Sequence, residues 1–446
     1  MNKTITLFEH QSLSYEELGF SPDHPVIDAL DQLNNSSRKT YIQLGLRSLK
    51  ATAYVGIIRI GEVTFQILPK IDYDPKGDPD QPIESDSNIR AVESASRNLL
   101  FLLSYALNIQ LHQQEISSLL TRRAGWLELL TFLFASGLHR ELQAGINHDY
   151  VPVEEPLPVI KGRWDIQRQL TTSPFTRHIF QLRYDQYSLD IPINRVFRYV
   201  SYNLLPQTFN SSTRTLLSDI FLWLDPAERM NSISTEYLDQ VSFSRLNDRF
   251  LPYFNLARLF IENQIVELLS GGRKVFAFLF DMNILFERFV FQLLNRNKSA
   301  ILPLDFMNLD VQSQAQGTTT YLVESVSLNR NIIRLRPDIQ FIHPLNEYPR
   351  LILDTKYKIL SDNDLRLRIA ESDLYQMLAY TVRFGCPLVL LIYPQGPNQI
   401  PIRSHFRFID YPADLFVSTI NIRQSLHEPG RLIDEFYTIF NQQIIW

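Results

Sequence analysis

The order of hydrophobic and polar positions predicts two neighbouring strands in the C-terminal part of the chain. In residues 335–342, Ile339 and Phe341 alternate with polar positions, as in a half-buried strand. Residues 351–358 begin with a run of three apolar residues, which is typical of a buried strand. The eight residues between them include two prolines and an asparagine, which favour a turn. We therefore expect two adjacent strands of one sheet.

Further helices and strands are predicted on both sides of this pair. Hydrophobic residues recur there at helical spacing, and one more apolar run reads as a buried strand. The predicted helices cover 281–290, 372–380 and about 430–440, and the further strands lie near 321–327, 332–335, 387–394 and 404–410. Helices and strands in this order predict an α/β sandwich for residues 275–446.

The N-terminal part of the chain begins with a predicted β-rich unit, residues 1–71. Within it, strands at 54–60 and 63–68 are expected to form a hairpin, because they flank the turn residues Gly61-Glu62. Residues 72–87 follow with three prolines and six carboxylates. That composition favours a solvated loop over a metal site, since the spacing of a calcium-binding loop is absent.

Residues 88–270 are predicted to be mostly helical. Helices are expected at 91–107, 126–142, 192–205, 212–224 and 253–270, with one strand at 180–185. The sequence thus predicts three regions, 1–71, 88–270 and 275–446. The first two form a mixed α+β N-terminal half, and the third is the α/β sandwich.

Composition excludes several classes of protein. The chain has 446 residues, 45% of them hydrophobic, and a net charge of −5, so any nucleic-acid contact must come from a local patch. The single cysteine, Cys386, excludes a disulfide framework and a four-cysteine zinc or iron–sulfur site. The sequence contains no P-loop motif for a nucleotide. We expect a cytoplasmic protein without a membrane segment, because no signal peptide or long apolar run is present.

Three charged residues on the first pair of strands form a candidate metal site. Asp338 lies on one strand and Asp354 on the next, and Lys356 shares a face with Asp354 because side chains alternate along a strand. Two carboxylates suit Mg²⁺, and the main-chain carbonyl of Thr355 is a candidate third ligand. Lys356 could orient a water nucleophile or stabilise a phosphate. The alternative is a surface ion pair of Asp354 with Lys356 or Arg336.

Two neighbouring helices add candidate residues. Gln376 and Tyr380 are four residues apart on the helix after the strands, so they share one face of it. Glu287 lies on the apolar helix before the strands. Its carboxylate either points towards the sheet or pairs with Arg288 or solvent.

This arrangement resembles the PD-(D/E)xK nuclease signature in Pro337-Asp338 and in Asp354-x-Lys356. RecB-like members of that superfamily carry a glutamine and a tyrosine on the helix after the active-site strands, as Gln376 and Tyr380 are placed here. Many members carry an additional acidic residue on the preceding helix, where Glu287 stands. The resemblance implies a mixed sheet flanked by helices, with Asp338, Asp354, Lys356, Glu287, Gln376 and Tyr380 as catalytic residues.

The whole chain resembles the McrC family, the nuclease subunit of McrBC-type modification-dependent restriction systems that act on 5-methylcytosine DNA. The resemblance is carried by Val55-Gly56-Ile57-Ile58 through Lys70-Ile71, Lys161-Gly162-Arg163-Trp164-Asp165, Ile191-Pro192-Ile193-Asn194-Arg195, Asp281-Met282-Asn283 with Phe286-Glu287, Arg336-Pro337-Asp338, Leu353 to Lys358, and Asp373 to Tyr380.

The McrC resemblance implies a Mg²⁺-dependent endonuclease that docks on an McrB-like AAA+ GTPase ring. The partner would bind GTP and recognise the modified double-stranded DNA, and the N-terminal half of this chain would be the docking element. Two alternatives stay open: a stand-alone RecB-like DNA nuclease, and a non-cleaving adaptor that activates a GTPase. Cleavage position, sequence context and stoichiometry are not predicted.

Basic residues near the candidate site are expected to contact the DNA backbone in spite of the acidic total charge. The residues of this predicted patch are Arg330, Arg334, Arg336, Lys358, Arg366 and Arg368. The alternative for each is an ordinary solvated surface residue.

Overall fold

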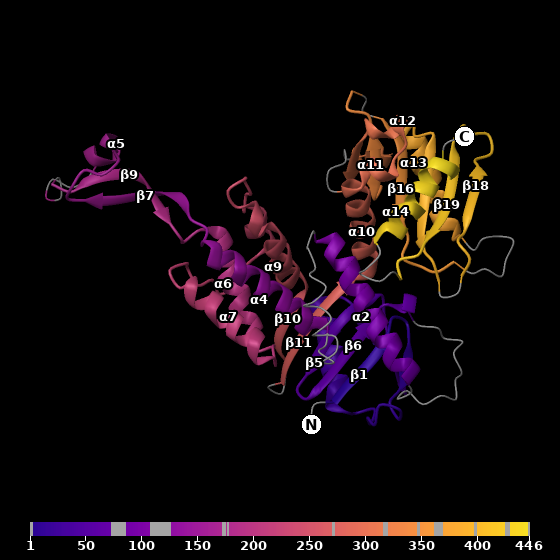
Figure 1. Ribbon diagram of the computed structural model, residues 1–446, viewed down its shortest axis with the longest axis horizontal. Helices are drawn as coiled ribbons and strands as arrows, with labels where there is room; N and C mark the ends of the chain where they lie inside the picture. The colour runs from indigo at the N-terminus through magenta and orange to yellow at the C-terminus, as the bar shows by residue number, and fades with distance from the viewer. Residues whose placement is uncertain are drawn as a thin grey trace. The chain divides into compact units, whose positions relative to one another are not determined.

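The structure is a computed structural model of the 446-residue chain. It describes residues 3–72, 86–107, 126–171, 175, 178–269, 273–314, 320–345, 348–360, 369–396, 399–423 and 429–444. The chain divides into two compact units: residues 1–109 together with 265–446, and residues 110–264. Several sheets and the helices between them make it a mixed α/β protein (Figure 1).

The first unit contains a five-stranded sheet in the order β1-β6-β5-β11-β10. The strands are β1 (Lys3–Phe8), β5 (Tyr54–Ile60), β6 (Val63–Leu68), β10 (Gln264–Leu269) and β11 (Arg273–Asp281). β5 and β6 form the predicted hairpin, and Gly61 at its turn has φ +58°, which glycine adopts without strain. β1 runs parallel to β6, so the carboxyl ends of these two strands lie side by side.

The strand β11 joins this N-terminal sheet although it lies far away in the sequence. It pairs antiparallel with β5, from Val275 opposite Ile60 to Asp281 opposite Tyr54. Residues 264–269, predicted as the end of a helix, form β10 instead, and the helix α9 (Leu251–Asn263) stops before them. The tertiary structure explains this difference, because the main chain of β10 pairs with β11. The helical spacing of residues within the segment does not predict that pairing.

Smaller elements complete the N-terminal part of this unit. The helix α1 (Pro25–Ser37) packs its apolar face into the same hydrophobic core as the five-stranded sheet. Strands β2 (Ser12–Ser14), β3 (Ile42–Leu44) and β4 (Ser48–Ala51) form a three-stranded sheet, and the 3₁₀ turn η1 (Lys70–Asp72) follows β6. The helix α2 (Asp86–Ala106) matches the helix predicted at 91–107.

A six-stranded mixed sheet organises the C-terminal part of the first unit. Its order is β12-β15-β16-β17-β19-β18, with β16, β17 and β19 parallel and the other pairs antiparallel. The strands are β12 (Asp310–Ser313), β15 (Ile339–Ile342), β16 (Pro349–Thr355), β17 (Leu388–Pro394), β18 (Arg403–Arg407) and β19 (Asp414–Ile420). The predicted strands at 351–358, 387–394 and 404–410 correspond to β16, β17 and β18, whereas β19 was missed.

Helices flank this sheet as predicted. They are α10 (Met282–Arg296), α11 (Lys298–Ile301), α12 (Leu304–Met307), α13 (Glu371–Phe384) and α14 (Pro429–Thr438), with the π-turn η4 (Ile439–Gln443) at the end. Asp281 caps α10 by accepting a hydrogen bond from the main-chain N–H of Asn283 at 2.9 Å. Gly385 ends α13 in the left-handed conformation, with φ +60°.

The predicted strand 335–342 is two strands in the structure. The first part ends β14 (Arg330–Leu335), which pairs only with β13 (Thr320–Ser325) among the described strands, and the second is β15. Arg336, Pro337 and Asp338 lie between them. Proline has no N–H for a sheet, which explains why the strand is interrupted there.

The second unit is mainly helical, with one small sheet. Its helices are α4 (Trp126–Ala144), α5 (Ile166–Leu170), α6 (Pro192–Leu204), α7 (Ser211–Trp223), α8 (Thr235–Asp239), the 3₁₀ turn η3 (Asp248–Phe250) and α9. Strands β7 (Asp149–Leu157), β8 (Arg163–Trp164) and β9 (Phe180–Ser188) form the sheet in the order β7-β9-β8. Within this unit, the β7–β9 ribbon extends away from α4, α6 and α7 (Figure 1). No helix among the described residues is long and apolar enough to span a membrane.

Candidate active site

Two aspartates meet where β15 begins and β16 ends. Asp338 directly precedes β15, and Asp354 is the next-to-last residue of β16. Ile339 is paired with Leu353 in this antiparallel pair, so Asp338 and Asp354 are neighbours at the same end of the ladder. The structure therefore brings together the two carboxylates that the sequence analysis selected, although Asp338 lies just outside its strand.

Thr355 holds the Asp338 carboxylate in place. Its main-chain N–H and its hydroxyl both donate to Asp338 Oδ2, each at 2.7 Å. The sequence alone suggested a role only for the main-chain carbonyl of Thr355. Two hydrogen bonds to one oxygen leave the other oxygen of Asp338 available to a ligand on that side of the site.

The Asp354 carboxylate is buried and only partly compensated. Its side chain is 1% exposed, and Oδ2 lies 2.6 Å from the Lys356 ammonium. Among the described residues, no hydrogen bond reaches Oδ1. Burial, together with the nearby Asp338 charge, raises the pKa of Asp354 to about 7. A buried carboxylate oxygen without a partner is costly to the fold, which is typical of a functional site.

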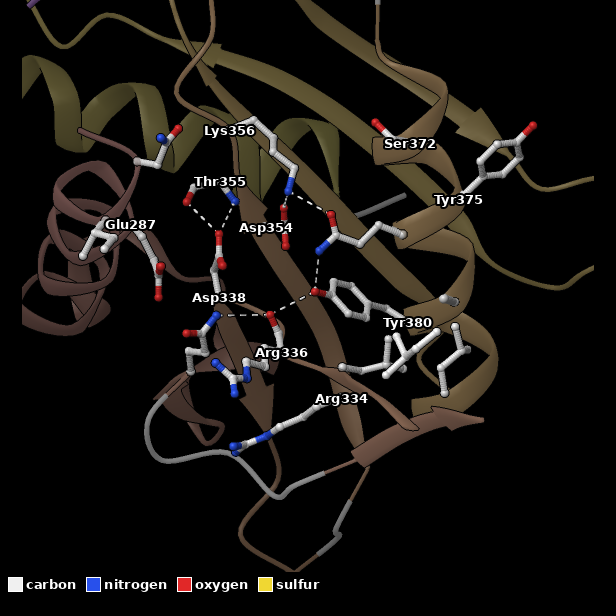
Figure 2. A pocket seen from close by; sticks show the side chains of 18 residues that line it. Glu287, Arg334, Arg336, Asp338, Asp354, Thr355, Lys356, Ser372, Tyr375 and Tyr380 are labelled. Carbon is white, nitrogen blue, oxygen red and sulfur yellow. Dashed lines mark hydrogen bonds and ion pairs between the residues drawn. The ribbon is translucent and has the colours of Figure 1, made fainter. Parts of the chain in front are cut away.

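Lys356 is fixed by a chain of hydrogen bonds that runs along α13 to the segment between β14 and β15 (Figure 2). Its ammonium donates to Gln376 Oε1 at 2.9 Å, and Gln376 Nε2 donates to the Tyr380 hydroxyl at 2.7 Å. Tyr380 in turn donates to the carbonyl oxygen of Arg336 at 2.9 Å. The glutamine and the tyrosine thus face the site together, one turn of helix apart, and orient the lysine without neutralising it.

Glu287 supplies a third carboxylate from α10. It is half-buried, and Figure 2 shows it on the side of the site where Asp338 lies. Burial and the charges of Asp338 and Asp354 raise its pKa to about 8. The charged forms of the three carboxylates repel one another, and a bound cation would stabilise them.

These residues line one pocket with a volume of about 690 Å³. One wall of the pocket includes Ile333 and Arg334 of β14 and Arg336, which follows that strand. Ile333 has φ +58°, a left-handed conformation that strains a β-branched residue. The lining residues are Asn283, Ile284, Glu287, Gln314, Leu322, Ile333, Arg334, Leu335, Arg336, Asp338, Asp354, Thr355, Lys356, Ser372, Tyr375, Gln376, Ala379 and Tyr380.

The predicted DNA-contact residues have different surroundings. Arg336 is exposed and lines the pocket, whereas Lys358 donates a hydrogen bond to the buried carboxylate of Asp373. Arg366 and Arg368 lie outside the described residues. Asp373 was not selected from the sequence. It also accepts a hydrogen bond from the Tyr393 hydroxyl at 2.9 Å, so it acts as an anchor between α13 and β17.

The donor set fits a hard divalent cation. Within the described ranges, no group of three or more His, Cys, Asp or Glu side chains is arranged as a complete metal site. Mg²⁺ does not need one, because one or two carboxylates suffice and water or substrate oxygens complete its shell. The unpartnered Oδ1 of Asp354 and the neighbouring Asp338 are oxygen ligands of this kind.

Comparisons with known proteins give one family match and two similar solved structures. A family model described as "McrBC 5-methylcytosine restriction system component" matches residues 49–394. A chain in the refined half-complex of Thermococcus gammatolerans McrB AAA+ hexamers with bound McrC is 23% identical, with a TM-score of 0.60, and the match covers 99% of this chain and 100% of that chain. A chain in the Thermococcus gammatolerans McrBC complex is 25% identical, with a TM-score of 0.48, over 66% of this chain and 88% of that chain. No curated protein matches.

Proposed function

Because the chain belongs to the family of McrBC 5-methylcytosine restriction system components, we propose that it is the McrC-type nuclease subunit of such a system. It is a Mg²⁺-dependent endodeoxyribonuclease whose C-terminal sheet is a PD-(D/E)xK nuclease fold. The observation that carries this proposal is the meeting of Asp338, Asp354 and Lys356 in one pocket, with one buried oxygen of Asp354 unpartnered. The alternative of a surface ion pair does not fit a carboxylate that is 1% exposed.

Each residue of the site has its own role in phosphodiester hydrolysis. Asp354 Oδ1 and Asp338 would hold Mg²⁺, with the Thr355 carbonyl as a further ligand. When bound, the cation supplies Lewis acidity towards the phosphate and the attacking water. Lys356, held by Gln376 and Tyr380, orients the water or stabilises the charge that develops on the phosphate. Glu287 adds a third carboxyl group beside Asp338, and a bound cation would favour its charged form.

DNA is expected to enter along the wall that carries Arg334 and Arg336. Both arginines line the pocket and are exposed, and neither guanidinium forms an ion pair with another residue in the described part of the chain. Guanidinium groups bind phosphate oxygens through paired N–H donors. Arg334 and Arg336 therefore remain proposed backbone contacts. Lys358 is the weaker candidate, because Asp373 already engages its ammonium.

The energy source and the recognition of the modified base are assigned to a partner. The similar solved structure contains McrB AAA+ hexamers with bound McrC, and we assign this chain an McrB-like GTPase ring as partner. The partner binds the GTP. Residues 88–270 are the proposed docking region. The small sheet of β7, β8 and β9 and the adjoining α5 supply exposed apolar side chains there, and these are Tyr150, Val159, Ile160, Trp164, Ile166, Leu170 and Tyr187.

A reconstitution assay tests the function. The chain, the partner GTPase, GTP, Mg²⁺ and methylated duplex DNA are combined, and cleavage and GTP hydrolysis are measured in parallel. We expect Asp354→Ala and Lys356→Ala to abolish cleavage and to leave the stimulation of GTP hydrolysis intact. Cleavage at the wild-type rate by either variant would show that the site assignment is wrong.

The same assay separates the alternatives. Cleavage without the partner or GTP would identify a stand-alone RecB-like nuclease. Stimulation of GTP hydrolysis without any cleavage, by the wild-type chain as well as the variants, would identify a non-cleaving adaptor.

A further inference from the structure

A buried glutamate and a half-buried lysine lie where β1 and β6 end. Glu9 follows β1 directly, and Lys70 lies two residues after β6, so the parallel pairing of these strands brings the two residues together. The main-chain N–H of Glu9 donates to the Leu68 carbonyl at 2.9 Å, and the main-chain N–H of Lys70 donates to Glu9 Oε2 at 3.0 Å. Glu9 is 3% exposed.

The Lys70 side chain reaches the residue that follows the active-site lysine. Its ammonium donates to the main-chain carbonyl of Tyr357 at 3.1 Å and lies 4.9 Å from the centre of the Tyr357 ring. Tyr357 is next to Lys356 in the chain. The main-chain N–H of Lys356 is itself bonded to the Ile392 carbonyl of β17 at 2.9 Å. Hydrogen bonds thus hold the backbone on both sides of Lys356. β17 holds the Lys356 N–H, and Lys70 holds the carbonyl of the next residue, Tyr357.

The Tyr357 ring also connects this point to α10. Its centre lies 5.7 Å from the centre of the Phe286 ring, and Phe286 precedes Glu287. The helix α10 begins directly at the end of β11, whose last residue, Asp281, is paired with Tyr54 of β5. The five-stranded N-terminal sheet therefore supports the active site at two points, through Lys70 and through the start of α10.

Packing alone does not explain a lysine and a glutamate at this position. Removing charged groups from water costs free energy, and apolar residues of similar size would fill such a space at lower cost. An ammonium, however, provides a directed hydrogen bond to one carbonyl oxygen, which an apolar side chain cannot. Phosphoryl chemistry depends strongly on the placement of the groups that act on it, and a shift of about 1 Å can cost about 100-fold in rate.

We propose that Lys70, held by Glu9, is a positioning residue for the nuclease reaction, because it fixes the main chain at Tyr357 and thereby the ammonium of Lys356. This inference rests on the proposed nuclease function. It gives the N-terminal sheet a role in cleavage, in addition to any role in docking. Lys70 does not touch DNA or metal in this account, and its effect passes through the backbone of residues 356–358.

The test uses the complete complex with Lys70→Met, Lys70→Arg and Glu9→Leu. Lys50→Met is the matched control, because Lys50 is an exposed lysine on β4 of the same N-terminal region. We expect Lys70→Met to lower the maximal cleavage rate by about 10- to 100-fold. The KM for DNA, the Mg²⁺ concentration for half-maximal activity and the stimulation of GTP hydrolysis should stay near wild type. Lys70→Arg should restore most of the rate, since a guanidinium can also donate to the carbonyl.

Each outcome decides between positioning and a general structural role. A wild-type cleavage rate for Lys70→Met overturns the proposal. A parallel loss of cleavage, GTP stimulation and thermal stability, without rescue by arginine, also overturns it, because Lys70 would then only stabilise the fold. If Lys70→Met does not fold, Glu9→Leu decides, since it removes the acceptor for the Lys70 N–H and keeps a side chain of similar size. A wild-type rate for that folded variant overturns the proposal. Failure of the wild-type complex to cleave would instead overturn the proposed function.

Discussion

Asp354 Oδ2 lies 2.6 Å from Lys356 Nζ, two residues further along the chain, in a pocket where the aspartate is almost completely buried. The pair is asymmetric. Lys356 has a second partner, Gln376, whereas Asp354 Oδ1 accepts no hydrogen bond from the described residues. The lysine is therefore satisfied within the protein, and the aspartate is left with capacity for an external ligand.

This asymmetry predicts that Asp354→Asn stabilises the metal-free protein while it removes activity. At pH 8 the wild-type carboxylate is charged although burial raises its pKa to about 7, and an amide of the same shape avoids that cost. We expect a gain of about 1–2 kcal/mol in the free energy of unfolding. Urea unfolding measures it, and added Mg²⁺ should stabilise the wild type but not the variant. A variant that is less stable than the wild type without metal would contradict this prediction.

The metal-free protein should lose stability as the pH rises from about 5 to 8. The pKa values of Glu9, Asp354 and Glu287 are raised to about 7, 7 and 8, chiefly by burial. A carboxyl group with a raised pKa binds more protons in the folded state than in the unfolded state. Its contribution to the free energy of unfolding is therefore greatest below its unfolded pKa, and it falls as the pH rises to its folded pKa. Thermal unfolding across this range, with and without Mg²⁺, measures the effect. Mg²⁺ should flatten the dependence because the cation favours the charged carboxylates, and a metal-free curve that is already flat would exclude this account.

Gln376→Leu should lower the cleavage rate by about 10-fold or more, because the Lys356 ammonium loses the acceptor that orients it. Tyr380→Phe should have a smaller effect, since it removes only the bonds between the Tyr380 hydroxyl, Gln376 and the Arg336 carbonyl. Single-turnover cleavage at saturating DNA measures both. The reverse order of the two effects would show that the chain of hydrogen bonds acts on the backbone at Arg336 and not on Lys356.

Arg334→Gln and Arg336→Gln should weaken DNA binding and reduce its dependence on salt, with the cleavage rate at saturating DNA nearly unchanged. Each lost phosphate contact lowers the slope of log affinity against log salt by about one. Arg350→Gln is the matched control, because Arg350 is exposed at the start of β16, at the far end of the strand from Asp354. DNA binding is measured at a series of salt concentrations, with each arginine substitution placed in the catalytically inactive Asp354→Ala variant. An equal loss of DNA affinity in all three variants would show that net charge, and not a specific phosphate contact, causes the effect.

Local patterns in the sequence by themselves determined many elements and two residue pairs of the site. Hydrophobic periodicity identified α10, α13, β16 and the β5–β6 hairpin, since helices and strands each impose their own spacing on buried positions. The two-residue repeat of a strand placed Lys356 beside Asp354, and the helical turn placed Tyr380 beside Gln376. The physical reason is that these relationships lie within one element, whose geometry is fixed by the backbone.

Only the tertiary structure decided the relationships between elements. The Thr355 hydroxyl on Asp338, the anchor that Asp373 gives to Lys358, and the bond from Lys70 to Tyr357 join residues 17, 15 and 287 positions apart. Likewise, β10 and β11 belong to the same sheet as β5, and no local spacing of residues predicts this pairing. Such contacts depend on the order and direction of strands in the sheets, which follow from the packing of the whole core and not from the periodicity of any single segment.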